Sequence, residues 1–146
     1  MLPETPSQTV GPYLSLGLPW EAGPVADPDG VRIEGLVLDR AGEPVLDALV
    51  ETWQRDPPTF ARGPTDDEGR WHVVVPLAPY LAVHVFARGL LRHLTTRVYL
   101  EPGGGGSRPR AGPARAPRDP DCQRDDDGYR FDICIQGEGE TVFFDV

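Results

Sequence analysis

The chain has 146 residues, a length that predicts one domain spanning residues 1–146, and its 23 acidic and 14 basic residues give a formal net charge of −9. This acidic balance argues against a nucleic-acid-binding protein, and no apolar run approaches the ~20 residues of a membrane helix. The 17 glycines and 17 prolines favour short strands joined by turns over helices.

Residues 1–30 are expected to form an arm and a loop rather than a strand. Pro6 and Pro12 restrict the residues before them to extended conformations, so residues 9–13 are predicted to form a stiff arm. The first residues show no basic stretch followed by an apolar one, so we expect no signal peptide. Cys122 and Cys134 form no CxxC pattern, which indicates reduced thiols in a cytoplasmic protein.

Alternating apolar residues predict about seven short strands and no convincing helix. Glycine-rich turns are predicted at 40–44, 66–69 and 136–140, and residues 55–70 are predicted to be a loop. This pattern favours an all-β fold, an antiparallel β-sandwich. The predicted strands are 31–39, 45–54, 71–75, two strands within 80–100, 129–135 and 141–146.

The two strands within 80–100 are separated by Gly89, which can adopt the positive φ of a turn. The run before Gly89 is apolar at nearly every position, which predicts that both of its faces are covered. The run after it alternates, as expected for a strand with one buried face. Arg88 lies at the end of the first strand, so by itself it is either a solvent-exposed arginine or a binding residue.

Residues 101–128 differ in kind from the rest of the chain. They hold the run Gly103-Gly104-Gly105-Gly106, many prolines and arginines, and almost no large apolar residue. Such a segment cannot contribute to a core, so it is predicted to be a long flexible loop before the last two strands.

No motif for a self-sufficient active site is present. His72, His84 and His93 form no HxH, HxxxH or HExxH pattern, so no metal site is predicted, and His84 is interpreted as an ordinary satisfied or exposed histidine. No GxSxG nucleophile motif occurs. No catalytic residue is therefore assigned to this chain alone.

Three segments are unusually specific: TPSQTVGPY at 5–13, FARG at 86–89 and RFDICIQGEGETVFFD at 130–145. In this order they resemble the α subunits of the protocatechuate 3,4-dioxygenases, which are intradiol aromatic-ring dioxygenases. The resemblance implies a transthyretin-like β-sandwich that pairs with a homologous β subunit in a large hetero-oligomer. The regions after Gly17 and after Gln54 look shorter here than in the family.

In that family the β subunit holds a non-haem Fe3+ ion through two tyrosines and two histidines. The corresponding histidine positions look like Tyr80 and Ala82 here, and the loop for a ligand tyrosine is reduced to residues 75–76. The resemblance therefore implies that iron is held by the β partner and that the isolated chain is inactive.

The resemblance further implies that this chain contributes substrate-binding residues to the partner's site. Arg88 is expected to face the carboxylate of protocatechuate, because a guanidinium matches a carboxylate in shape and charge. Thr9, Gly11, Pro12 and Tyr13 are expected to line the β-chain pocket, although the arm could instead merely seal the subunit contact.

The implied function is completion of a site that cleaves protocatechuate with O2 to 3-carboxy-cis,cis-muconate, a step of aromatic catabolism in the β-ketoadipate pathway. The alternative is a non-catalytic β-sandwich that acts as a scaffold or a small-ligand binding module. The missing iron ligands favour this alternative, whereas the arm, Arg88 and the C-terminal motif favour the subunit of a dioxygenase.

Overall fold

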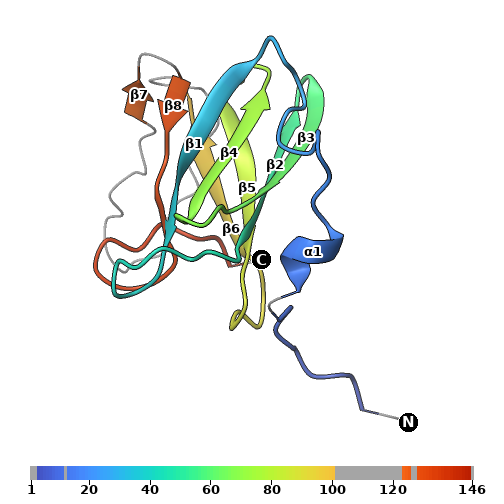
Figure 1. Cartoon of the computed structure of the whole chain (residues 1–146), viewed down its shortest axis with the longest axis vertical. Coiled ribbons are helices and arrows are strands. Elements are labelled where there is room, and N and C mark those ends of the chain that lie inside the picture. Colours follow the sequence, from blue (N-terminus) through green and yellow to red (C-terminus); the bar gives the residue numbers. More distant parts are fainter. Residues whose placement is uncertain (1–2, 12, 101–122, 126–127, 146) are drawn as a thin grey trace.

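A computed structural model of the chain describes residues 3–11, 13–100, 123–125 and 128–145, and their strands form two sheets packed face to face (Figure 1). One sheet has the order β4-β1-β8-β7, with β9 also paired to β1, and the other has the order β3-β2-β5-β6. The predicted β-sandwich is therefore confirmed. The strands are β1 (Val31–Leu38), β2 (Leu49–Arg55), β3 (Pro58–Pro64), β4 (Arg70–Val75), β5 (Tyr80–Phe86), β6 (Leu94–Tyr99), β7 (Gln123–Asp125), β8 (Gly128–Arg130) and β9 (Ile133–Cys134).

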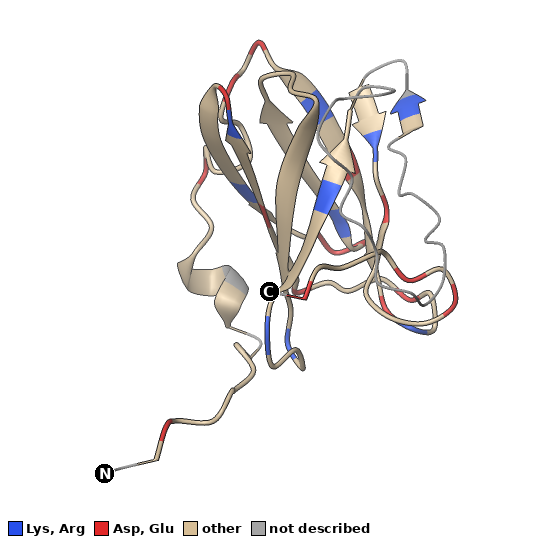
Figure 2. Ribbon diagram, turned by 180° about the vertical axis from the view of Figure 1, so that it is seen from behind, with Lys and Arg blue, Asp and Glu red and all other residues tan. Residues whose placement is uncertain are grey.

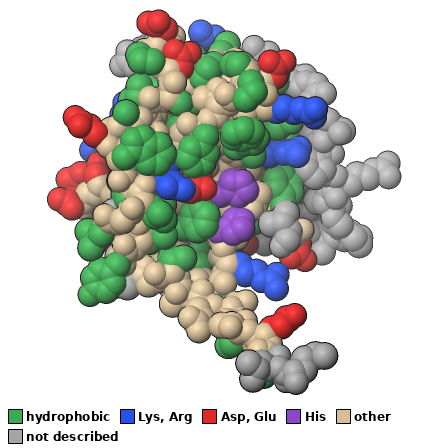
Figure 3. All heavy atoms as spheres, turned by 90° about the vertical axis from the view of Figure 1, so that its right-hand side faces the viewer, with side chains coloured by type: hydrophobic (Ala, Val, Ile, Leu, Met, Phe, Trp, Pro, Cys, Tyr) green, Lys and Arg blue, Asp and Glu red, His purple; other side chains and the backbone are tan. Residues whose placement is uncertain are grey.

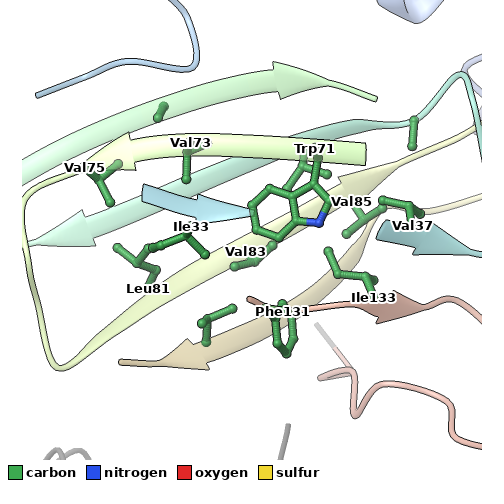
Figure 4. Packing of buried hydrophobic residues seen from close by; sticks show 14 of the residues in the cluster. Ile33, Val37, Trp71, Val73, Val75, Leu81, Val83, Val85, Phe131 and Ile133 are labelled. Atoms are coloured by element: carbon green, nitrogen blue, oxygen red, sulfur yellow. The ribbon is translucent and has the colours of Figure 1, made fainter. Parts of the chain in front are cut away.

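The core lies between the sheets and is built by the alternation that the sequence displays. Trp71 of β4 lies among side chains from both sheets, including Ile33, Val83 and Val85 (Figure 4). These four side chains are at most 1% exposed. Burying one such side chain stabilises a fold by roughly 1.5–3 kcal/mol, so the packed core supplies a rigid support for the strand ends and turns.

Strand β5 buries only one of its faces in this chain. Leu81, Val83 and Val85 point into the core, whereas the alternate residues from Tyr80 to Phe86 are half-buried on the outer face of the four-stranded sheet. The prediction that both faces of this strand are covered is therefore wrong for the chain by itself. No strand or helix that the structure describes forms a layer over this outer face.

The predicted loop 55–70 contains a strand, β3, which forms a hairpin with β2. Its register pairs Thr52 with Ala61 and Val50 with Gly63. Pro58 and Pro64 made this segment resemble a loop in the sequence. They lie at the two ends of β3, on the edge of the sheet, where a missing N–H is tolerated.

The predicted strand 129–135 is interrupted, and its two parts, β8 and β9, both pair with β1 in parallel. At the interruption the two backbones lie close together, since a Cβ on Gly35 would lie 1.9 Å from the carbonyl oxygen of Phe131. The sandwich is thus not wholly antiparallel. Strand β7 falls within the predicted loop 101–128, whereas residues 101–122 and 126–127 of that loop lie outside the described residues.

The last predicted strand, 141–146, is not formed within the described residues 141–145. This segment instead follows β6 through two isolated hydrogen bonds. The hydroxyl of Thr96 donates to the carbonyl of Val142 at 2.7 Å, and the N–H of Phe144 donates to the carbonyl of Thr95 at 2.8 Å.

One helical turn, α1 (Leu14–Gly17), was not predicted. In the part of the chain that the structure describes, no helix has the length and apolar character needed to cross a bilayer.

Candidate functional site

The N-terminal arm, residues 3–11, lies beside the turn that joins β5 to β6 (Figure 1). The backbone N–H of Gly89 in this turn donates a hydrogen bond to the side-chain oxygen of Thr9 at 2.8 Å. The same oxygen accepts a longer bond, 3.4 Å, from the N–H of Gly11. One hydroxyl therefore joins two segments that are 80 residues apart in the sequence.

Arg88 lies on this turn, two residues after the end of β5. Figure 2 shows basic residues on the turn, at one end of the sandwich. The side chain of Arg88 is 70% exposed, and its Nε lies 3.1 Å from Oδ2 of Asp47, whose side chain is only 20% exposed. The guanidinium is thus held on one edge and is otherwise accessible.

Gly11 and Tyr13, two further predicted arm residues, make few contacts with the described part of the chain. Gly11 has a φ of +72°, which favours glycine, and the predicted φ > 0 at Gly89 is confirmed at +85°. A Cβ on Gly11 would meet no atom within 4 Å, so Gly11 makes no close approach to described atoms of its own chain. Tyr13, beside α1, is 75% exposed, and Pro12 lies outside the described residues.

A cleft of about 300 Å³ opens between the arm and the turn. Because the arm supplies one wall of the cleft, any movement of the arm changes its shape. Its lining residues are Gln8, Val10, Phe86, Ala87, Leu90, Leu91, Arg92 and His93.

Two histidines lie side by side near this cleft, on the outer face of the four-stranded sheet (Figure 3). The ring centroids of His84 and His93 are 5.3 Å apart, and His93 stacks on Phe86 at 5.2 Å. His84 Nδ1 lies 3.2 Å from the hydroxyl oxygen of Thr95. Burial lowers the pKa of His84, and the charge of His93 lowers it further. These contacts agree with the interpretation of His84 as an ordinary satisfied histidine.

The positions expected to correspond to the iron-binding histidines do not form a metal site. The ring of Tyr80 packs against Tyr99 at 6.1 Å, and the guanidinium of Arg97 lies over the ring of Tyr80 at 4.9 Å. The side chain of Ala82 has no donor atom, and neither of the two positions is a histidine, so the imidazole pair that the family's β chain uses is absent from them. Among the described residues, no three His, Cys, Asp or Glu side chains are grouped so that they could hold a metal ion.

Comparison with known proteins decides the family. No family model matches the sequence. The chain is 35% identical to the protocatechuate 3,4-dioxygenase alpha chain of Pseudomonas putida, and the alignment covers 99% of this chain and 98% of that protein. It is 34% identical to the alpha chain of the same name from Burkholderia cepacia, again over 99% and 98% of the two chains. The chain belongs to the protocatechuate 3,4-dioxygenase alpha-chain family.

This alpha chain shares its fold with a solved dioxygenase domain. The dioxygenase domain of a dioxygenase–carbohydrate-binding fusion protein from Streptomyces sp. SirexAA-E covers 89% of this chain and 95% of that chain, with a TM-score of 0.51 and 23% identity. The alignment to the P. putida protein spans 196 positions, which exceeds the 146 residues here, so this alpha chain lacks segments of its relative. Intradiol dioxygenases depend on non-haem iron, and the described residues of this alpha chain show no cluster of three His, Cys, Asp or Glu side chains that could hold it.

Asp47 contacts Arg88, and the sequence did not indicate it. It precedes β2, and the register of β2 with β5 pairs Leu49 with Phe86. Continuing this pairing by two residues places Asp47 opposite Arg88, in agreement with their contact. A single carboxylate before a strand carries no local signal, so only the strand register identifies it.

Proposed function

We propose that this alpha chain completes the active site of an iron-bearing β chain, at which protocatechuate reacts with O2 to give 3-carboxy-cis,cis-muconate. The names of the two relatives, which align over nearly their whole length, support this substrate and a β partner in a hetero-oligomer. The iron belongs to the β chain in this proposal, since Tyr80 and Ala82 stand where the resemblance places the two histidine ligands.

Arg88 binds the carboxylate of the substrate in the proposed complex. Its exposed guanidinium offers a planar set of donors to the two carboxylate oxygens. A charge-assisted contact of this kind contributes roughly 1.5–3 kcal/mol. It holds the ring with its two hydroxyls turned away from this chain, so that Arg88 acts by orienting the substrate.

The hydrogen bond between Thr9 and Gly89 is the observation that carries the proposal. It brings the arm to the residue next to Arg88, so the two segments that the resemblance assigns to the site lie side by side in this chain. Thr9, Gly11, Pro12 and Tyr13 then form the part of the pocket wall that comes from this chain. The exposure of Tyr13 supports a role at a partner's surface.

Co-expression with the β chain from the same source tests this proposal. The complex is purified through a tag on the alpha chain, and iron content and protocatechuate-dependent O2 uptake are measured. Arg88→Ala is expected to raise the KM for protocatechuate about tenfold to a hundredfold. Catechol, which has no carboxylate, serves as a competitive ligand whose Ki is expected to stay unchanged.

Arg70→Ala, at an exposed arginine on the other sheet, is the matched control and is expected to leave KM unchanged. If Arg88→Ala also leaves KM and turnover unchanged, Arg88 does not bind the substrate. If the tagged chain purifies folded but without a β chain, the scaffold or binding-module alternative takes the place of this proposal.

A further inference from the structure

We propose that Asp47 is a positioning residue for Arg88, holding the Nε edge of the guanidinium so that the two terminal nitrogens face the substrate carboxylate. The inference rests on the proposed function of Arg88. Its direct basis is the 3.1 Å distance between Arg88 Nε and Asp47 Oδ2. The two side chains meet where β2 begins beside the end of β5, because continuing the β2–β5 register by two residues places Asp47 opposite Arg88.

Asp47 comes from the more rigid side of this contact. The next residue, Ala48, is fully buried, and its N–H donates to the hydroxyl oxygen of Thr65 at 3.0 Å. The carbonyl of Ala48 accepts a bond from the N–H of Thr65 at 2.9 Å. The backbone beside Asp47 is therefore tied to the residue that follows β3, whereas Arg88 lies on an exposed turn. The carboxylate sets the position of the arginine, not the reverse.

The chemistry of the guanidinium gives this contact a direction. Its five N–H groups lie in one plane, and a carboxylate can engage either the edge that contains Nε or the edge formed by the two terminal nitrogens. Because Asp47 engages Nε, the terminal edge is left for a second carboxylate. Holding a long side chain in one orientation also removes part of the entropy cost of binding.

A second effect opposes the first. Asp47 partly offsets the charge of Arg88, so its negative charge repels the substrate carboxylate. Arg88 is well exposed and the repulsion is screened by water and salt, so we expect orientation to dominate. Removing the charge of Asp47 raises KM if the orientation of Arg88 dominates and lowers KM if the repulsion of the substrate dominates. A measurement of KM therefore decides between the two effects.

Two other exposed pairs among the described residues, Arg32–Glu34 and Arg130–Asp132, each join residues two apart in the sequence. Only a tertiary contact can fix a turn relative to another strand, so these local pairs do not share the function proposed for Asp47. Glu34→Gln removes one carboxylate from such a pair and provides a matched control on the other sheet.

The test uses the complex with the β chain and four variants: Asp47→Asn, Arg88→Ala, the double variant and Glu34→Gln. Asp47→Asn is expected to raise the KM for protocatechuate about two- to fivefold, with kcat and the Ki of catechol nearly unchanged. The double variant is expected to match Arg88→Ala, because Asp47 acts only through Arg88. Glu34→Gln is expected to behave as the parent complex.

The failures of the two proposals are distinguishable. If Arg88→Ala has no effect, the proposed function is wrong. If Arg88→Ala raises KM but Asp47→Asn leaves it unchanged or lowers it, the positioning role is wrong and the proposed function stands. NMR of the isolated chain provides a readout without the partner, since Asp47→Asn is expected to shift the Arg88 Nε–H resonance and to speed its exchange with water. An unaltered resonance would overturn the inference.

Discussion

The side-chain oxygen of Thr9 accepts a hydrogen bond from the backbone N–H of Gly89 at 2.8 Å. This bond attaches the arm to the same turn that presents Arg88, so the position of one candidate binding element depends on the other. Since residues 3–10 are exposed, few contacts other than this bond fix where the arm lies. The arm and the turn therefore form one structural unit.

We expect Thr9→Val to detach the arm without unfolding the sandwich, because valine keeps the shape of threonine but offers no acceptor. Losing one such bond costs roughly 0.5–1.5 kcal/mol, which corresponds to about a two- to tenfold increase in arm opening. Hydrogen exchange of the Gly89 amide and limited proteolysis of residues 3–11 measure this. Thr9→Ser retains the hydroxyl, so the Gly89 amide is expected to stay protected from exchange and residues 3–11 from proteolysis. If Thr9→Val protects them as well as the parent chain does, the bond does not hold the arm.

Gly89→Ala is expected to impair the site as well as stability. Its φ of +85° costs a residue with a Cβ about 1–2 kcal/mol, although the added Cβ itself has space. Gly42→Ala is a matched control, since Gly42 has a φ of +81° in a remote turn and the same open space. Both variants are expected to lose similar stability in urea denaturation. Only Gly89→Ala is expected to raise the KM of the complex for protocatechuate. If Gly42→Ala raises KM equally, the effect of Gly89→Ala is not specific to the site.

The ion pair between Arg62 and Glu51 is expected to stabilise the four-stranded sheet. Their side chains are 20% and 16% exposed, and Arg62 also donates to the carbonyl of Leu18 at 3.2 Å. Glu51→Gln leaves the arginine without its charged partner and is expected to cost about 1–3 kcal/mol of unfolding free energy. Arg32→Gln, in an exposed pair, is expected to change stability by about 0.5 kcal/mol or less. Denaturant titrations that give equal losses would contradict this ranking.

His84 is expected to make stability depend on pH. Burial, followed by the charge of His93, lowers its pKa, while Glu51 acts in the opposite direction. Because the unfolded chain takes up this proton near its ordinary pKa of about 6.5, the contribution of neutral His84 is complete above that pH. It is lost as pH falls from there through the lower pKa of the folded state. His84→Gln is expected to flatten this part of a plot of Tm against pH, and an unchanged slope would contradict it.

The contact between His84 and His93 can be tested separately. His93→Asn removes a positive charge from the neighbourhood and is expected to raise the pKa of His84. The pKa of His72, which burial lowers first and Arg32 lowers second, is expected to stay where it is. NMR titration of the imidazole protons reports both values in one experiment. A parallel shift of His72 would indicate a general rearrangement instead of a local interaction.

Local sequence pattern was sufficient for most strands and for their inward faces. Alternation correctly predicted a strand in 31–39, whose Ile33 and Val37 are buried in the core, and glycine correctly marked the turn at Gly89. Pattern failed at β3, where prolines at the strand ends resembled a loop. It also failed at residues 141–145, where β-forming residues follow β6 without regular pairing. The β-propensity of a residue describes the backbone conformations that it prefers by itself. Whether a segment pairs as a strand depends on which other segment lies beside it in the fold.

The sequence by itself determined the family, since three specific segments and an alignment over nearly the whole chain point to the same relatives. It also determined which residue types are available for binding. Only the tertiary structure decided that Thr9 meets Gly89 and that Asp47 meets Arg88. Both contacts depend on strand register and on the path of the arm. These are set by the packing of the whole sandwich, since residues far apart in the chain carry no local signal of their meeting.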